Sequence, residues 1–279
     1  MTLNRVTLAT LGTFLYRHRS WTAIPVIALA LTLLARHPPA PAESTAITLF
    51  CHTSAALLVL SGVLLRIWTI VQVPPGACGR GRRLHATLLV TWGPYRWTRN
   101  PLYFANFLIV LGLLCQTRSI PVGALVIPFF VLQYHAVIRA EESFLRNTFG
   151  ATFETWAAQV PRFWPRPPSR TATSPGTFRP KGSTSLDPLF IHRMGNALMR
   201  DADTWFASLG GLLLLRWWSG APAGIDQILN AGHAVSSEAA PAVIPLHTWW
   251  EPRAFGFLLG AYLAVRMWKW AYRWKRGNR

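Results

Sequence analysis

Six apolar segments alternate with loops that are either rich in arginine or nearly bare of it, and this alternation restricts the fold most. The segments cover roughly residues 21–35, 45–73, 102–117, 120–138, 205–218 and 254–270. A helix needs about 20 residues to cross a bilayer, and several segments approach that length only with their flanking tryptophans and arginines. We therefore predict an all-α fold, a polytopic transmembrane bundle of about six helices.

The composition agrees with a membrane protein. Hydrophobic residues make up 51% of the chain and charged residues only 14%, whereas soluble domains carry about a quarter charged residues. The net charge of +18 can indicate a nucleic-acid partner, but arginines that alternate with apolar segments are typical of topology control. The cysteines show no CxxC or Cys/His spacing and predict no metal site. We expect the lipid bilayer and a lipid-like substrate as partners, and no nucleic acid.

The placement of the arginines predicts the orientation. They are frequent before the first segment, between the second and third, after the fourth and in the C-terminal tail, while the alternate loops hold only Arg36, Arg118 and Arg253. Cytoplasmic loops carry the excess of Lys and Arg. Both termini are thus predicted in the cytoplasm, with the first segment retained as a helix rather than cleaved as a signal peptide. Short loops and many arginines favour a bacterial inner membrane.

A linker divides the chain. Residues 165–188 are rich in proline, serine, threonine and glycine, a composition typical of extended segments. They separate a four-helix core in residues 1–164 from a C-terminal pair of membrane helices in residues 189–279. The sequence indicates neither a role for this pair nor an oligomeric state.

A polar turn, GPYRWTRNPLYF, runs directly into the third apolar segment. Asn100 occupies a helix N-cap position and Pro101 the first helical position, where the missing N–H costs nothing. The N–H groups of this helix start, beside Arg96 and Arg99, suit a carboxylate or a phosphate. The alternative is a capped, basic helix end that only marks the cytoplasmic side of the membrane.

Two adjacent carboxylates, Glu141 and Glu142, stand at the inner end of the fourth apolar segment. Adjacent helical residues are ~100° apart, so the two cannot serve one point equally. Glu142 shares a helical stripe with His135, Arg139 and Arg146. The alternative reading is an interfacial helix with solvated Glu–Arg pairs, although carboxylates at a membrane boundary are also candidates for function.

The predicted orientation brings both clusters to one membrane face. Carboxylates accept hydrogen bonds from an ammonium group or from ribose hydroxyls, whereas a helix start with arginines suits a carboxylate. S-adenosylmethionine carries all three groups. The physical chemistry therefore permits this ligand without selecting it.

One family pattern runs through both clusters. The matching residues are, in order, Gly93, Tyr95, Arg99, Pro101, Tyr103, Glu141, Glu142, Leu145, Phe149, Gly150, Trp156 and Pro161. Through them the chain resembles, over residues 84–165, the isoprenylcysteine carboxyl methyltransferases and phospholipid methyltransferases. The resemblance implies a membrane enzyme that uses S-adenosylmethionine to methylate a carboxylate or amine on a lipid-like or isoprenylcysteine-like acceptor.

The same resemblance implies the site residues. The cofactor would be held by Arg99, Asn100, Pro101, Tyr103, Glu141 and Glu142. No catalytic residue is identified, and the candidates beside the acceptor are Tyr95, Arg96, His135 and Arg139. Asn100 stands where the family has histidine. Ala105 stands where glycine is frequent, so its methyl group is expected to narrow the approach of a ligand to the backbone.

Two other functions stay open. Membrane reductases of the sterol type, which use NADPH, also carry an Arg-x-Pro-x-Tyr near a helix start. The other possibility is a non-catalytic membrane protein that has retained the scaffold. Asn100, in place of the family's histidine, would then reflect the loss of catalytic activity. In that case the C-terminal helix pair would be a docking module for a partner.

Overall fold

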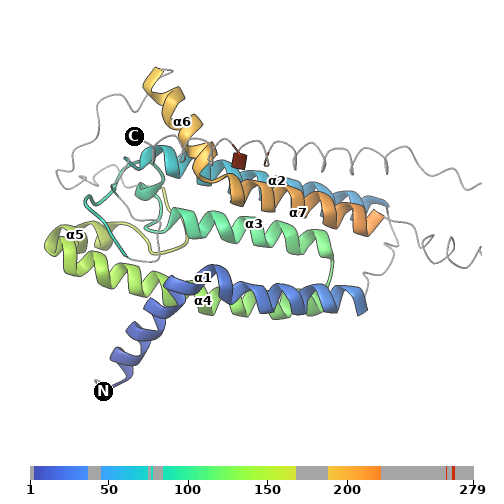
Figure 1. Ribbon diagram of the computed structural model, residues 1–279, viewed down its shortest axis with the longest axis horizontal. Helices are drawn as coiled ribbons and strands as arrows, with labels where there is room; N and C mark the ends of the chain where they lie inside the picture. Colours follow the sequence, from blue (N-terminus) through green and yellow to red (C-terminus); the bar gives the residue numbers. More distant parts are fainter. Residues whose placement is uncertain are drawn as a thin grey trace, which may run out of the picture.

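A computed structural model describes residues 3–36, 45–74, 77, 84–167, 188–220, 262, 266 and 267, and these form a bundle of helices (Figure 1). Its elements are α1 (Leu3–Arg36), α2 (Thr45–Gln72), η1 (Gly93–Arg96), α3 (Pro101–Thr117), α4 (Ile120–Phe149), α5 (Ala151–Gln159), α6 (Pro188–Arg200) and α7 (Ala202–Gly220). The predicted all-α class is confirmed, since the described residues contain no β-strand. Most of the linker, and the last apolar segment apart from three residues, lie outside the described part.

Within the described residues, two helices have the length and apolar character to cross a membrane. They are the stretches Ala46–Gln72 in α2 and Ile120–Phe149 in α4. Shorter apolar stretches occupy Trp21–Arg36, Pro101–Thr117 and Ala202–Leu215. These positions agree with five of the apolar segments expected from the sequence, and together they support a helical membrane bundle.

The helices pack as two pairs, α2 with α3 and α1 with α4 (Figure 1). Within the first pair the backbones meet closely at glycine. A Cβ atom built on Gly62 would lie 2.7 Å from the Ala105 carbonyl oxygen and 2.6 Å from Ile109 Cγ1. Ala105 is fully buried in this contact. The expectation that Ala105 narrows the approach of a ligand is therefore wrong, because its face of α3 meets α2.

This contact makes a prediction about stability. Gly62→Ala should lower the free energy of unfolding by about 1–3 kcal/mol, because the added methyl group forces α2 away from α3. The matched control is Gly123→Ala in α4, where a built Cβ meets nothing within 4 Å. Unfolding of both variants in mixed micelles measures the difference. Equal stability of the two variants would contradict the close packing.

The C-terminal elements lie against the first pair of helices. α6 packs on α2, and α7 runs along α2 and α3, as Figure 1 shows. The junction between α6 and α7 is Asp201, which is buried. The described part of the C-terminal region is therefore in direct contact with the segments that carry the predicted site.

Candidate active site

The first predicted cluster begins at Asn100. Asn100 is the N-cap of α3, and its carbonyl oxygen accepts hydrogen bonds from the N–H groups of Tyr103 and Phe104, at 3.1 and 3.0 Å. Its side chain makes no cap. Asn100 Nδ2 instead donates to the Arg162 carbonyl oxygen at 2.9 Å, and the residue is buried. The predicted cap position is thus confirmed, but the asparagine amide holds the chain that follows α5.

Backbone contacts fasten the same two segments together. Arg99 N–H donates to the Pro161 carbonyl at 2.9 Å, and Arg166 N–H donates to the Trp97 carbonyl at 3.0 Å. The Thr98 hydroxyl donates to the Phe163 carbonyl at 3.0 Å. We call these contacts and the Asn100–Arg162 bond the clasp. The clasp fixes Pro161 to Arg166 across the start of α3, and so places the Arg162 side chain at the site.

Glu142 lies between two guanidinium groups. Its carboxylate is 3.4 Å from Arg99 Nη1, and it accepts from Arg162 Nε at 3.0 Å and from Arg162 Nη2 at 2.9 Å. Glu142 is only 4% exposed. Burial lowers the pKa of Arg99 from its ordinary value and Arg162 lowers it further, while Glu142 raises it. Two positive charges against one carboxylate leave this cluster with an excess of positive charge.

Two buried polar atoms in this cluster have no hydrogen-bond partner among the described residues. They are Arg99 Nε and Glu142 Oε1. A buried donor or acceptor without a partner costs about 1–3 kcal/mol. The cluster therefore has one donor and one acceptor with which a polar ligand can bond.

Glu141 has a different environment from its neighbour. The Tyr103 hydroxyl donates to Glu141 Oε1 at 2.7 Å, which joins the start of α3 to the end of α4. Glu141 is half-buried, whereas Glu142 is buried. The two adjacent carboxylates have different partners, in agreement with the expectation that they cannot serve one point equally. The structure brings Arg99, Asn100, Tyr103 and both glutamates to one end of the bundle, with Pro101 buried at the first position of α3.

The four candidates expected beside the acceptor differ in their surroundings. Arg96, His135 and Arg139 are exposed. Tyr95 packs against the buried cluster of Leu89, Phe153, Trp156 and Val160 beneath α5. The helical stripe that Glu142 shares with His135 and Arg139 is divided, because Glu142 faces inward while the other two are exposed. Arg146, the last member of that stripe, pairs with the exposed Glu154 of α5.

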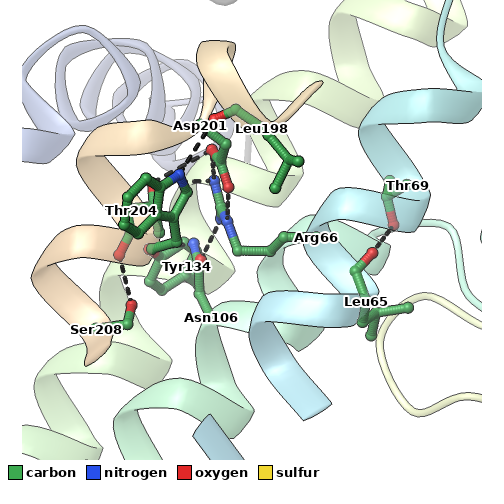
Figure 2. A network of polar contacts seen from close by, with 10 residues as sticks. Leu65, Arg66, Thr69, Asn106, Tyr134, Leu198, Asp201, Thr204 and Ser208 are labelled. Atoms are coloured by element: carbon green, nitrogen blue, oxygen red, sulfur yellow. Dashed lines mark hydrogen bonds and ion pairs between the residues drawn. The ribbon is translucent and has the colours of Figure 1, made fainter. Parts of the chain in front are cut away.

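Sequence reasoning missed a second polar network, which Figure 2 shows. Arg66 of α2 donates from Nε and Nη2 to the two carboxylate oxygens of Asp201, at 2.8 and 2.7 Å, and also donates to Asn106 Oδ1. Asn106 Nδ2 is bonded to the Tyr134 hydroxyl at 3.0 Å. One signal was available: Arg66 interrupts an apolar run, and an ionisable residue within a membrane segment is a candidate for function.

An aromatic layer lies on the apolar side of the site. The Phe163 and Trp164 rings pack edge-on against Phe104 and Phe107 of α3, at centroid distances of 5.5 to 6.1 Å. Beside this layer is a small apolar pocket between α3 and α4. Its lining residues are Phe107, Val110, Leu111, Leu114, Ile127 and Phe130. The site is thus polar at the helix ends and apolar toward the middle of the bundle.

The sequence is similar to one protein family and to two named proteins. The sequence model described as "Phospholipid methyltransferase" matches residues 50–152. The nickel-cobalt-cadmium resistance protein NccN of Alcaligenes xylosoxydans xylosoxydans is 34% identical over 158 residues, which are 56% of this chain and 68% of that protein. The cobalt-zinc-cadmium resistance protein CzcN of Cupriavidus metallidurans is 35% identical over 158 residues, which are again 56% of this chain and 68% of that protein. No solved structure matches.

Proposed function

We propose that this chain, which belongs to the phospholipid methyltransferase family, transfers a methyl group from S-adenosylmethionine to a lipid-like or isoprenylcysteine-like acceptor in the membrane. The resemblance predicted from the sequence is thereby confirmed at the level of the family. One observation supports the proposed activity most. The two motifs, which are a whole helical hairpin apart in sequence, meet in the 2.7 Å bond between Tyr103 and Glu141.

The charges at the site fit the cofactor. Arg99 and Arg162 carry more positive charge than Glu142 neutralises, and Arg99 keeps a buried Nε without a hydrogen-bond partner in the described part. This side suits the cofactor's carboxylate, as guanidinium groups do. Glu141 is half-buried and suits a ribose hydroxyl or the ammonium group. The residues present therefore fit a zwitterion that carries a ribose.

The chain's contribution is positioning and exclusion of water. When bound, S-adenosylmethionine supplies a methyl group that is already activated on a sulfonium ion. The clasp and the Tyr103–Glu141 bond fix the polar side chains before any ligand arrives, which is the condition for efficient positioning. The aromatic layer limits access of water from the apolar side. A carboxylate acceptor needs no general base, whereas an amine acceptor must first lose a proton.

The proposed location is a bacterial inner membrane with both termini in the cytoplasm. The site lies at the start of α3 and toward the end of α4, the ends that the arginine distribution assigns to the cytoplasmic face. The acceptor's lipid tail would lie in the bilayer against the apolar residues of α3 and α4. Reporter fusions at the two termini test this orientation, and a signal from the far side of the membrane would refute it.

Titration calorimetry of the purified, folded chain tests the cofactor. We expect saturable binding of S-adenosylmethionine, because donor and acceptor groups for both of its polar ends are already held in place. Absence of binding at millimolar cofactor would overturn the proposal. A parallel titration with NADPH separates the methyltransferase from the sterol-type reductase. Mass spectrometry of membrane lipids from cells with and without the gene then identifies the acceptor.

The names of the two relatives support a cellular role in resistance to divalent heavy metals. In this proposal, methylation of a membrane component supports tolerance, and the chain itself need not bind the ion. Among the described residues, no three His, Cys, Asp or Glu side chains are grouped so that they could hold a metal.

Complementation separates this role from direct handling of the metal. A strain that lacks the gene should recover growth on cobalt or nickel with the wild-type chain and with Glu154→Gln, whose exposed carboxylate lies in α5. Glu141→Gln should fail to restore growth, because it removes the charge that we assign to the cofactor. Full recovery with Glu141→Gln would show that tolerance does not need methyl transfer. Immunoblots confirm equal amounts of each variant.

A further inference from the structure

We infer that Asp201, at the junction of α6 and α7, positions Tyr103 and Glu141 through a chain of side-chain contacts across the bundle. The contacts run from Asp201 to Arg66, then to Asn106, Tyr134 and Tyr103. Their last member is the Tyr103–Glu141 bond. The inference rests on the proposed function only for the identity of the ligand that this pair binds.

The first link is a buried ion pair. The Arg66 and Asp201 side chains are 12% and 7% exposed, and both carboxylate oxygens are engaged by the guanidinium fork. The Thr204 hydroxyl adds a third contact to Asp201, at 3.3 Å. Apolar residues could dock α6 and α7 equally well, since replacing a buried ion pair by hydrophobic residues is often neutral or stabilising. The packing of α6 and α7 on α2 therefore does not by itself explain why Asp201 is charged.

The second link has a fixed direction. Asn106 Oδ1 accepts from Arg66, and so the amide must present its Nδ2 donor to the Tyr134 hydroxyl, 3.0 Å away (Figure 2). A guanidinium group has donors only, whereas an amide has one donor end and one acceptor end. The position of the Arg66 charge therefore decides which way Asn106 points. Asn106 in turn fixes the Tyr134 hydroxyl.

The third link reaches the site. The Tyr134 ring lies 4.9 Å from the Tyr103 ring, at an interplanar angle of 57°. The Phe130 ring also packs against the Tyr134 ring, with their centroids 4.3 Å apart and the rings tilted by 36°. Tyr103 is thus held by a ring whose own hydroxyl is anchored, and its hydroxyl meets Glu141. A change at Asp201 is transmitted to the site by packing and by hydrogen bonds.

Asp201 lies outside the part of the chain that the family model matches. The matched range is residues 50–152. Arg66, Asn106 and Tyr134 lie within it. The C-terminal region of this chain therefore supplies a positioning residue for a site whose other members come from the family core.

Two variants and one control test the inference. Asp201→Asn removes the charge with little change of shape, and Tyr134→Phe keeps the ring and the ion pair but removes the hydroxyl that bonds Asn106. Asp203→Asn is the matched control, because this exposed carboxylate two residues away pairs only with groups of the C-terminal region in the described contacts. If Asp201→Asn does not fold, Tyr134→Phe carries the test.

The first readout needs no ligand. Hydrogen exchange of the free protein should quicken in the first turns of α3 and around Glu141 in both variants, and not in Asp203→Asn. An increase confined to α6 and α7 would overturn the inference, because it would mean that Asp201 only docks these helices. This readout decides the inference even if S-adenosylmethionine does not bind the wild-type chain, a result that refutes the proposed function instead.

The second readout is cofactor affinity. Asp201→Asn should raise the dissociation constant for S-adenosylmethionine by about tenfold, in the range of couplings seen within one contact network. The double variant Asp201→Asn/Tyr103→Phe should bind S-adenosylmethionine as weakly as Tyr103→Phe alone, because Asp201 affects the site through Tyr103. Additive losses would overturn this route. Unchanged affinity in Asp201→Asn would overturn it as well.

Discussion

Glu142→Gln should lower the free energy of unfolding by roughly 3–5 kcal/mol, the cost of removing one partner from a buried ion pair. Glu142 is only 4% exposed and neutralises part of the charge on Arg99 and Arg162. Glutamine fills the same space but leaves Arg99, whose side chain is only 13% exposed, without its counter-charge, whereas water can solvate the 42% exposed Arg162 side chain. Unfolding of the purified variant in mixed micelles measures the loss.

The control for this prediction is Glu154→Gln. Glu154 also pairs with an arginine, Arg146, but its side chain is 53% exposed. An exposed ion pair contributes only about 0–1 kcal/mol, so this variant should unfold almost as the wild type does. A loss in Glu142→Gln no larger than that in Glu154→Gln would mean that the carboxylate is solvated. The alternative reading of an interfacial helix with solvated pairs would then be favoured.

Glu141→Gln should weaken binding of S-adenosylmethionine about tenfold to a hundredfold, because hydrogen bonds to a charged group contribute about 1.5–3 kcal/mol. Stability should change little, since the amide oxygen of glutamine can still accept from the Tyr103 hydroxyl. Calorimetry of the folded variant gives the dissociation constant, and a thermal melt gives the stability.

Tyr103→Phe distinguishes positioning from direct binding. This variant leaves the Glu141 charge in place but removes the 2.7 Å bond that orients it. The affinity for S-adenosylmethionine should fall by less than in Glu141→Gln. The carboxylate can still reach the ligand, but its side chain then loses conformational entropy on binding. If neither variant changes the affinity, Glu141 is not part of the cofactor site. The non-catalytic alternative would then be favoured.

Local features of this chain were predictable because they depend on neighbours in sequence. The Asn100–Pro101 pair predicts the start of α3, since both residues act within one turn of the helix. The ~100° between adjacent helical residues predicts that Glu141 and Glu142 have different partners. Arginine-rich loops and apolar runs predict the helical segments. None of these inferences needs the tertiary structure.

The partners of the site residues were not predictable in this way. Arg162 reaches Glu142 only because α5 turns the chain back and the clasp holds it against α3. Arg66 and Asp201 are 135 positions apart, and nothing in a single sequence pairs them. The packing of Ala105 against α2 could not be predicted either, because it depends on Gly62, a glycine in another helix.

The clasp has a consequence for how this part of the protein responds to pH. Its two side-chain donors are the Thr98 hydroxyl and the Asn100 amide, and neither gains or loses a proton in the physiological range. Histidine, which the family carries at the position of Asn100, changes its charge between about pH 5 and 8. Asparagine therefore keeps the same donor on either side of neutrality, and this bond between the start of α3 and the segment after α5 is expected not to change with pH in that range.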